Sequence, residues 1–377
     1  MSLPLPSTKH FAELTVLRAA LLTRRVISAV TEISKHDATP VTMADFGAQA
    51  LIMAALHGVF PEDGYVGEED AETLRKDEAL AKTVFELVRE IGDEFAKHEA
   101  VNAGEDLGVR SLPGVMSQAE MLDLLDLAGR GTPGPKGRYW VMDPVDGTAT
   151  FLKGQQYAIS LALVEDGKEV LSVLCYPNLS LDEGVVAETG VDTTGCGVML
   201  STIRGEGIDY RKLSTEYSLG PSRKLDRFPA STSLADLRLV DCLASKSSRL
   251  DIAEGLAKQI GALPFPGIDL WSSHVRYGAL MLGEGEEGKH IMIRVPVGAR
   301  RDPSRAYVWD HAGSQLLYTE MGGKVTDLEG KDIDFGAGRT LAANWGLVAR
   351  PGGCSRGDFE IGQGVDCQGF KLIQRRS

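Results

Sequence analysis

The fold is decided by the stretch Trp140-Val141-Met142-Asp143-Pro144-Val145-Asp146-Gly147-Thr148-Ala149-Thr150-Phe151-Leu152-Lys153-Gly154. Its apolar first residues lead into two aspartates, Asp143 and Asp146, which stand three residues apart. Pro144 fixes one backbone dihedral angle, and Gly147 permits a sharp turn into the residues that follow. The pattern predicts a strand end that holds two carboxylates rigidly, with a helix opening at Gly147 and Thr148.

Carboxylates at this spacing suit Mg²⁺, which binds hard oxygen ligands and keeps coordination positions open for phosphate oxygens. The unpaired N–H groups of a helix that starts at Gly147 would in addition attract a phosphate. The same residues also describe an Asp-Pro-x-Asp-Gly surface turn, because Asp, Pro and Gly each favour turns. Taken alone, the stretch leaves both interpretations open.

The bulk composition is that of an ordinary globular protein. The chain has 377 residues, of which 43% are hydrophobic and 25% are charged, and this length indicates two domains or one large layered domain. The net charge of -13 argues against a nucleic-acid polymer as partner, because such binding depends on Lys and Arg. A small phosphorylated partner stays compatible with it, since a carboxylate cluster filled with divalent ions becomes locally positive.

The cysteines indicate a reducing compartment. They form an odd and scattered set without the spacing of a zinc site or a disulfide framework: Cys175, Cys196, Cys242, Cys354 and Cys367. The sequence also has no secretory leader pattern and no apolar run of about 18 residues. We therefore expect a cytoplasmic protein that has no membrane partner.

Two helices and an acidic step are expected in the first part of the chain. Apolar residues recur at helical spacing over 10–35, and a second helix starts near Thr42 and places Asp45 in its first turn. An acid there could simply complement the helix dipole. The strand-like residues 64–67 lead into Glu68-Glu69-Asp70, which by itself could be a solvated acidic face.

The following residues predict a mixed α/β protein. Strands are expected over 157–164 and 170–175, joined by a hairpin turn at 165–168, and a flexible loop is expected over 129–138. The chain becomes polar around 217–235. We expect a domain boundary there, with an N-terminal α+β domain over 1–215 and a C-terminal α/β domain over 216–377.

A third acidic motif lies in the second half, within Trp309-Asp310-His311-Ala312-Gly313. Asp310 stands where a helix is predicted to begin, and that helix should end at Gly322-Gly323 before a strand. Locally, the role of a helix N-cap explains Asp310 completely. His311 alone is best interpreted as a structural histidine.

Taken together, the motifs Gly67-Glu68-Glu69, Asp143-Pro144-Val145-Asp146-Gly147-Thr148 and Trp309–Gly313 resemble the lithium-sensitive, Mg²⁺-dependent phosphomonoesterase superfamily that includes inositol monophosphatase. Within it the chain looks most like the 3'(2'),5'-bisphosphate nucleotidases, particularly the fungal form. Thr39-Pro40-Val41-Thr42 and the tail Asp334–Leu341 support this resemblance, which covers about Phe11 to Val348.

The resemblance implies a layered αβαβα sugar-phosphatase fold with two or three Mg²⁺ ions between its halves. It implies metal ligation by Glu68, Asp143, Asp146, Asp310 and the Val145 carbonyl, water activation by Asp45 and Thr148, and phosphate binding by the amides of Gly147 and Thr148. The physical logic agrees, because phosphoryl transfer needs an in-line water and neutralisation of the oxygen charges.

The resemblance is weaker in the substrate pocket. Ser273 and Arg294 match substrate-contacting positions of the nucleotidases, whereas Arg276 replaces a lysine and Lys246 replaces a histidine of the fungal forms. Ala149-Thr150 and Ala306-Tyr307 also depart from the usual residues. The chemistry is thus expected to be intact, with changes in the pocket.

Three functions stay open at this point. The first is hydrolysis of the 3'-phosphate of adenosine 3',5'-bisphosphate to AMP, with a small bisphosphorylated nucleotide as partner. The second is the same chemistry on an inositol phosphate or a specialised phosphorylated metabolite. The third is a non-catalytic regulatory paralogue, which is disfavoured because such a protein has no evident need for every metal-binding carboxylate.

Overall fold

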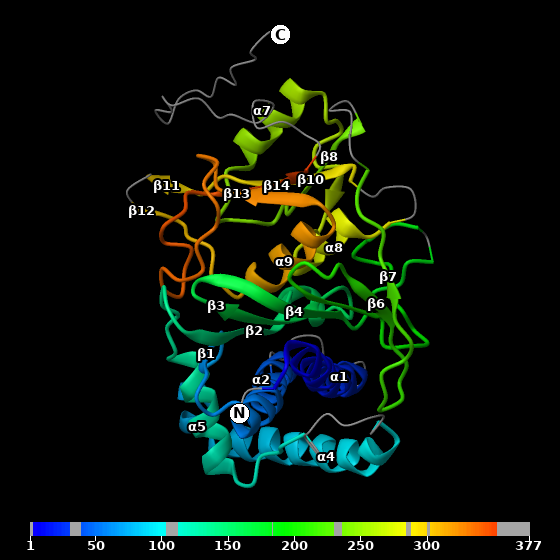
Figure 1. Ribbon diagram of the computed structural model, residues 1–377, viewed down its shortest axis with the longest axis vertical. Helices are drawn as coiled ribbons and strands as arrows, with labels where there is room; N and C mark the ends of the chain where they lie inside the picture. The colour runs from blue at the N-terminus through cyan, green and yellow to red at the C-terminus, as the bar shows by residue number, and fades with distance from the viewer. Residues whose placement is uncertain are drawn as a thin grey trace.

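Helices and sheets alternate in layers through the molecule. The structure, a computed structural model, describes residues 3–30, 39–102, 112–182, 184–229, 236–283, 288–299 and 302–352. From one end to the other, Figure 1 shows a helical layer, a large sheet, a pair of helices, a smaller sheet and an outer helix. This is the αβαβα order that the family resemblance implies, and the prediction of the fold class is confirmed.

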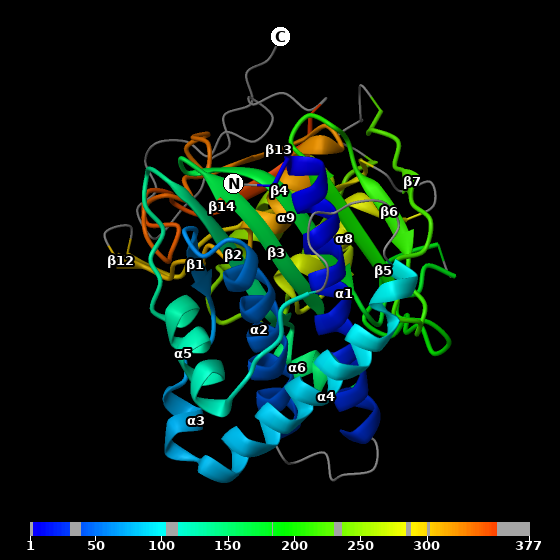
Figure 2. The same ribbon diagram turned by 60° about the horizontal axis from the view of Figure 1, so that its bottom comes forward.

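The first layer holds the helices of the N-terminal third. They are α1 (Leu5–Val30), α2 (Thr39–Val59), α3 (Glu72–Lys76), α4 (Glu78–Asn102) and α5 (Gln118–Gly129). Figure 2 shows α1 and α2 lying across one face of the large sheet, with α4 crossing both on the side away from the sheet, in front of them in this view. Their buried apolar residues join those of the central strands in one hydrophobic core, as expected for helices that pack one apolar face against a sheet.

The large sheet places the acidic strand ends. Among the described residues it has seven strands in sequential order: β1 (Gly64–Gly67), β2 (Arg138–Asp146), β3 (Ala158–Glu165), β4 (Lys168–Tyr176), β5 (Val198–Ile203), β6 (Asp209–Lys212) and β7 (Arg223–Lys224). β1 pairs with β2 in parallel, and the other pairs are antiparallel. Consequently the carboxyl ends of β1 and β2 meet at the same edge.

The other half is built on the smaller sheet. Its described strands run in the order β13 (Gly323–Thr326), β14 (Leu347–Pro351), β10 (His290–Arg294), β8 (Arg238–Asp241) and β9 (Ile268–Asp269), and a ribbon of β11 (Gly298–Ala299) and β12 (Asp302–Pro303) lies apart. The helices α8 (Ser273–Met281) and α9 (Ala312–Glu320) lie between the two sheets, and α7 (Leu250–Ile260) covers the outer face.

Several boundaries differ from those that the sequence predicts. α1 starts at Leu5, and its expected end at Lys35 lies outside the described residues. α2 starts at Thr39, so Asp45 falls in its second turn and the helix-dipole explanation of this acid is wrong. The predicted hairpin between β3 and β4 is confirmed, and its turn residues Asp166 and Gly167 both have positive φ angles, of 49° and 77°.

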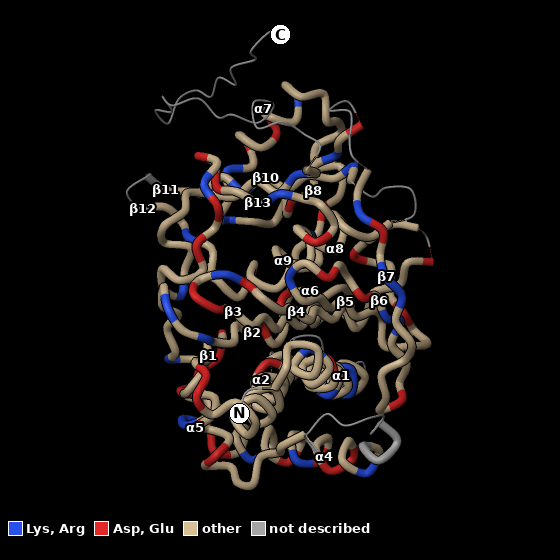
Figure 3. Tube along the Cα trace, in the orientation of Figure 1, with Lys and Arg blue, Asp and Glu red and all other residues tan. Residues whose placement is uncertain are grey.

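No helix within the described parts of the chain is long and apolar enough to cross a bilayer. Figure 3 shows acidic and basic residues interspersed along the surface helices, as on α4. The carboxylates of interest to function lie instead between the two halves, at the layer that contains α8 and α9.

Candidate active site

A β-bulge turns both aspartates of the central stretch to the same side of the sheet. Asp143 pairs with Ser160 of β3 and Asp146 pairs with Ala158, so β2 has one residue more than β3 between these pairs. In a regular strand, residues three positions apart point to opposite faces, and the extra residue reverses this. Pro144 suits the bulge because it has no N–H to give to the ladder. Ligand oxygens of Asp143 and Asp146 therefore lie within 4.8 Å of one another.

Asp146 is held by the first residues of α8. Its Oδ2 accepts hydrogen bonds from Ser272 Oγ and from the backbone N–H of His274, each at 2.6 Å. Gly147 follows with a φ angle of +102°, and a Cβ there would lie only 3.0 Å from Ser272 Cβ. Glycine is thus required where β2 passes α8. The short helix α6 (Thr148–Phe151) begins directly afterwards, as the sequence predicts.

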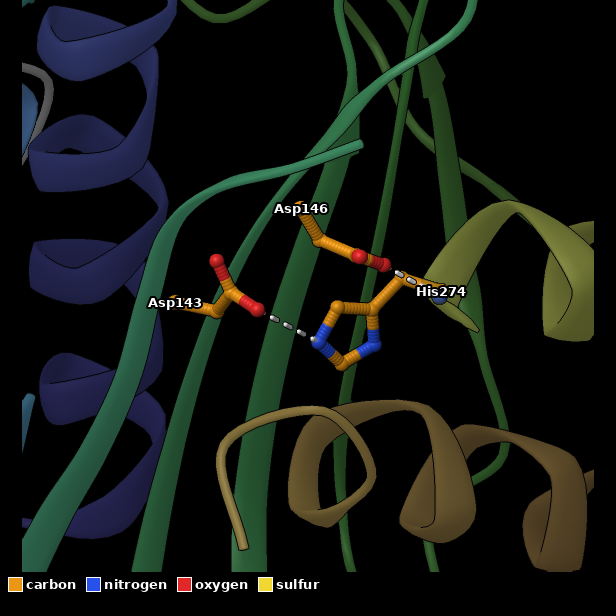
Figure 4. A group of neighbouring side chains, drawn as sticks. All are labelled: Asp143, Asp146 and His274. Atoms are coloured by element: carbon orange, nitrogen blue, oxygen red, sulfur yellow. Dashed lines mark hydrogen bonds and ion pairs between the residues drawn. The ribbon is translucent and has the colours of Figure 1, made fainter. Parts of the chain in front are cut away.

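His274 lies beside the two aspartates but has no nitrogen left for a metal ion. Figure 4 shows its ring directed from α8 toward Asp143, with Nε2 4.0 Å from Asp143 Oδ2. Nε2 also lies 2.9 Å from the Trp309 carbonyl oxygen, and Nδ1 is hydrogen-bonded to Ser314 Oγ. Burial lowers the pKa of the imidazole, so the ring is neutral and forms no ion pair with Asp143.

Glu68 approaches the same place from the end of β1. The side-chain amide of Gln49 exchanges two hydrogen bonds with the backbone of Glu69, at 2.5 and 3.0 Å. On the other side of Glu68, the Gly67 carbonyl oxygen accepts a hydrogen bond of 2.6 Å from Arg339 Nη2. The backbone is therefore fixed on both sides of Glu68, by a helix of the first half and by a segment close to the C-terminal strand β14.

Asp45 belongs to the same helix as Gln49, four residues earlier, and so faces the same side of α2. Its side chain is buried, with 6% exposure. Burial, together with the negative charges of Glu69 and Glu68, raises the pKa of Asp45 well above its ordinary value. The structure thus brings Asp45 to the acidic cluster that the sequence alone could only suggest.

Asp310 does not cap a helix. The N-cap position of α9 is His311, and the His311 side chain makes no capping hydrogen bond. Asp310 Oδ2 instead accepts a hydrogen bond of 3.3 Å from the backbone N–H of Tyr307, on its N-terminal side. The N-cap explanation of Asp310 is therefore wrong. Burial and the negative charge of Asp146 raise the pKa of the Asp310 carboxyl group, so the two acids interact.

The carboxyl groups raise one another's pKa. Burial and the charges of Glu68, Asp146 and Asp310 raise the pKa of Asp143 well above its ordinary value. Burial and the charge of Asp146 raise the pKa of Asp310 to about 7. Burial and the charges of Glu69, Asp310 and Asp146 raise the pKa of Glu68 to about 8, although this residue keeps an exposed surface. The cluster repels further negative charge and attracts cations.

The cluster fits a hard divalent cation. Asp143 Oδ1 is buried and has no hydrogen-bond partner within the described residues. A buried carboxylate without a partner is costly, and a cation would remove both this cost and the repulsion between the acids. Oxygen ligands without a thiolate or an available imidazole suit Mg²⁺ better than Zn²⁺. The residues present therefore match the Mg²⁺ expected from the sequence.

Two arginines of the second half lie near Asp310 and influence its pKa. Arg294 ends β10, and its Nη2 donates to the Ser304 carbonyl oxygen at 3.0 Å. Burial lowers the pKa of Arg294, while the charge of Asp310 opposes this change. Arg294 thus presents a partly desolvated positive charge close to the acids.

Arg276 is more firmly engaged by its own segment. Its Nη1 donates to the carbonyl oxygens of Leu270 and Trp271, each at 3.1 Å, and its Nη2 donates to Ser273 Oγ at 3.0 Å. The structure therefore places Arg276 and Ser273 together, as parts of one hydrogen-bonded turn at the start of α8. Lys246 is exposed on the loop after β8, outside this turn.

The remaining site residues lie on the central stretch. Thr148 is exposed at the first position of α6, next to Gly147. The Val145 side chain is buried, with 1% exposure, and this residue lies inside the bulge that interrupts the pairing of β2 with β3. Backbone groups in a bulge are released from the ladder, which suits the carbonyl of Val145 to ligation.

Comparison with known proteins agrees with the family that the sequence motifs indicate. Residues 8–352 match the model of the inositol monophosphatase family. A 3'(2'),5'-bisphosphate nucleotidase of Emericella nidulans is 39% identical over 91% of this chain and 94% of its own length. One of Schizosaccharomyces pombe is 34% identical over 90% of both chains, and one of Oryza sativa is 34% identical over 84% of this chain and 81% of its own.

Solved structures agree on the fold. The crystal structure of Staphylococcal IMPase-II superposes with a TM-score of 0.52 at 15% identity, covering 92% of this chain and 89% of its own. Mycobacterium tuberculosis SuhB gives a TM-score of 0.50 at 16% identity, covering 92% and 91%. At this level of identity the likeness concerns the fold alone.

Proposed function

The chain belongs to the inositol monophosphatase family, and on that premise we propose that it hydrolyses the 3'-phosphate of adenosine 3',5'-bisphosphate to AMP. The observation that carries the proposal is the bulge in β2, which brings Asp143 and Asp146 together within reach of the charges of Glu68 and Asp310. The relatives named above as 3'(2'),5'-bisphosphate nucleotidases support the choice of substrate.

The family generally depends on Mg²⁺, and the acidic cluster provides a place for it. We propose that Glu68, Asp143, Asp146, Asp310 and the carbonyl oxygen of Val145 hold two or three ions. When bound, such ions neutralise the phosphate oxygens and increase the acidity of a water molecule. Four carboxylates would also lose their mutual repulsion, which explains why the chain tolerates them in one place.

The residues of the chain supply the positions and the proton acceptor. Asp45 is the proposed base, and Thr148 the group that orients the attacking water. A raised pKa makes the ionised Asp45 carboxylate a stronger base than an exposed aspartate. The water oxygen bonds to phosphorus and gives a proton to Asp45 as the bond from phosphorus to the 3'-oxygen breaks. The 3'-oxygen then takes up a proton and leaves as the 3'-hydroxyl of AMP, while the amides of Gly147 and Thr148 hold the released phosphate.

The second phosphate is assigned to the cationic side of the site. Arg294 is the leading candidate because it lies near Asp310 with a partly desolvated guanidinium. Ser273 and Arg276 form the adjoining turn, and the exposed Lys246 on the loop after β8 is a further candidate. We also place the protein in the cytoplasm, since Cys175, Cys196 and Cys242 are free thiols.

A phosphate-release assay with Mg²⁺ tests the proposal. Adenosine 3',5'-bisphosphate, inositol 1,4-bisphosphate and simple phosphate monoesters are compared at equal concentration. The highest kcat/KM is expected for adenosine 3',5'-bisphosphate, and EDTA should abolish the activity. Higher kcat/KM for an inositol phosphate would move the substrate to the inositol class, and no turnover of any ester would favour a regulatory paralogue.

Inhibition by other cations is a second check on the same chemistry. Ca²⁺ prefers longer bonds and a looser geometry than Mg²⁺, so it should displace the reacting groups and inhibit. Inhibition by Li⁺ is expected from the resemblance to the lithium-sensitive superfamily. Undiminished rates in millimolar amounts of either ion would contradict the mechanism.

A further inference from the structure

Trp271 is a large apolar side chain that the core does not cover. Its exposure is 37%, whereas Trp140 is fully buried and Trp309 is 4% exposed. Its backbone is nevertheless held on both sides. The N–H donates to Glu188 Oε1 at 2.7 Å, and the carbonyl oxygen accepts from Arg276 Nη1 at 3.1 Å. The indole is therefore displayed from a fixed backbone position.

The Trp271 ring carries a positive charge on one face. Lys153 Nζ lies 4.1 Å from the ring centroid, within the range of a cation–π contact. Lys153 follows α6, which opens directly after Asp146 and Gly147. The contact thus joins the loop after the phosphate-binding residues to the turn before α8, and it leaves the exposed part of the indole for a ligand.

Trp271 also stands at the expected position for a substrate contact. It follows β9 by two residues, and β8 and β9 run in parallel, so their carboxyl ends open on the same side. Ligands of α/β sheets bind outside the carboxyl ends of such strands. The next residue, Ser272, is hydrogen-bonded to Asp146, and Ser273 belongs to the proposed substrate contacts.

We propose that Trp271 is the stacking surface for the planar base of the substrate. This inference rests on the proposed nucleotidase function and adds a residue that selects a nucleobase. A base and an indole stack through their flat π-faces, whatever the base, whereas a saturated inositol ring covered with hydroxyl groups has no such face. Because Lys153 lies over one face of the indole, only the other face can stack with a base, and it accommodates one base.

The test compares Trp271→Ala and Trp271→Phe with the wild type on two substrates. With adenosine 3',5'-bisphosphate, Trp271→Ala should raise KM by roughly 5- to 150-fold, the loss expected for one base–aromatic stack, with kcat changed little. Trp271→Phe should restore most of the affinity. With inositol 1,4-bisphosphate, as a substrate or as a competitive inhibitor, both variants should equal the wild type.

A binding measurement without turnover provides the second readout. AMP should quench tryptophan fluorescence in the wild type, and the quench should be lost in the folded Trp271→Phe protein. Met116→Ala is the control for removal of an exposed apolar side chain, since Met116 is 85% exposed on the other half. It should leave KM and the quench unchanged.

The outcomes separate this inference from the proposed function. Turnover of adenosine 3',5'-bisphosphate with the same KM in wild type and Trp271→Ala would overturn the stacking role alone. An equal rise of KM for the nucleotide and the inositol bisphosphate would overturn it as well, because the effect would then not concern the base. A wild type that fails to hydrolyse adenosine 3',5'-bisphosphate would overturn both.

Discussion

His274 Nε2 lies 2.9 Å from the carbonyl oxygen of Trp309, the residue before Asp310. A carbonyl oxygen can only accept, so Nε2 carries the proton and Nδ1 accepts the hydroxyl proton of Ser314. These two hydrogen bonds hold the ring in one tautomer, and the ring connects α8 to the loop that carries Asp310. Because its own backbone N–H also holds Asp146, His274 contributes to the positions of two acids, Asp146 and Asp310.

His274→Gln should retain most of the activity, and His274→Ala should lose it together with stability. A glutamine amide can donate to Trp309 and accept from Ser314, whereas alanine leaves both buried groups unpaired at a cost of about 1–3 kcal/mol each. Thermal unfolding, kcat and calorimetric Mn²⁺ affinity would be measured for both variants. Equal loss of Mn²⁺ affinity in the two would instead make His274 a metal ligand.

Asp143→Asn should remove nearly all activity without unfolding the protein. Asparagine has almost the same volume, so no cavity forms, but the site loses a carboxylate charge. Loss of several kcal/mol of transition-state stabilisation would reduce kcat to below about 1% of the wild-type value. Circular dichroism and the melting temperature check that the variant is folded. Substantial turnover at saturating Mg²⁺ would contradict the role of Asp143.

Without a divalent cation, the protein should become less stable as the pH rises from 5 to 8.5. The pKa of Glu68 is raised from 4.5 to about 8, and that of Asp310 from 3.8 to about 7. At a pH between the ordinary and the raised pKa of each group, the folded protein binds more protons than the unfolded chain. Its free energy of unfolding therefore decreases with rising pH. Melting temperatures in EDTA across this range measure the effect.

Millimolar Mg²⁺ should reverse that decrease, because a cation favours the ionised carboxylates. Glu68→Gln provides the matched control. The variant should show a flatter pH dependence in EDTA, a higher melting temperature than the wild type at pH 8.5, and a smaller gain from Mg²⁺. If the stability of the wild type instead rises with pH in EDTA, the pKa values of these carboxyl groups are not raised in the folded protein.

Arg294→Ala should raise KM for bisphosphorylated substrates far more than for monophosphates. Loss of one charged hydrogen bond to a phosphate costs about 1.5–3 kcal/mol, or roughly ten- to a hundred-fold in affinity. Arg294→Lys tests the geometry, since lysine keeps the charge without the bidentate fork. Steady-state kinetics on adenosine 3',5'-bisphosphate and AMP decide the matter. An equal rise of KM for both substrates would show that Arg294 does not bind the second phosphate.

Asp192→Asn should destabilise the protein near neutral pH but much less in acid. Burial opposes ionisation of Asp192, but hydrogen bonds from the N–H groups of Gly195, Thr194 and Gly197 outweigh it and lower the pKa. A lowered pKa stabilises the fold above the unfolded pKa, and this contribution is lost as the pH falls through the folded pKa.

The expected difference in free energy of unfolding is about 1.5–3 kcal/mol at pH 7, the value of hydrogen bonds to a charged group. It should shrink as the pH falls below the ordinary aspartate pKa and through the lowered pKa of the folded protein, because a protonated Asp192 is as neutral as asparagine. Urea unfolding of the two proteins across this range provides the measurement. A difference that does not depend on pH would assign the effect to geometry and not to charge.

The layers follow from local patterns, but the completed site does not. The run Ala158–Glu165, the turn at Asp166 and Gly167 and the run Lys168–Tyr176 carry their own strand and turn signals, and the structure confirms them. The motif Asp143-Pro144-Val145-Asp146 also contains the signal for the bulge, because proline leaves the ladder. Such features depend on neighbours in the sequence, which is why they can be predicted.

The start of α5 carries a local sequence signal. α5 lies in a segment from which no helix was expected, although Ser117-Gln118-Ala119-Glu120 has the form of a capping box. Ser117 Oγ accepts from the Glu120 N–H, and Glu120 Oε2 accepts from the N–H of Met116. The helix could therefore have been found from these four residues.

Other features have no local signal. The contacts of His274 reach 35 positions to Trp309 and 40 positions to Ser314, and those of Arg339 reach 272 positions to Gly67. Such partners are chosen by the packing of whole layers, so no spacing rule predicts them. The segment over 129–138 likewise has contacts that its sequence does not predict. Gly131 lies against the Tyr65 carbonyl, and its own carbonyl oxygen accepts a hydrogen bond from Arg339.

The hydrogen bond from Arg339 to Gly67 also determines how late in translation the site can be completed. A ribosome that adds about 5–20 residues per second makes Arg339 roughly 14–54 s after Gly67, across the 272 positions between them. During that interval the nascent chain already contains Glu68, and later Asp143 and Asp146, but not the arginine that fixes the strand before Glu68. Phosphatase activity should therefore be absent from ribosome-bound chains that stop short of Arg339, and appear only once this late segment has emerged.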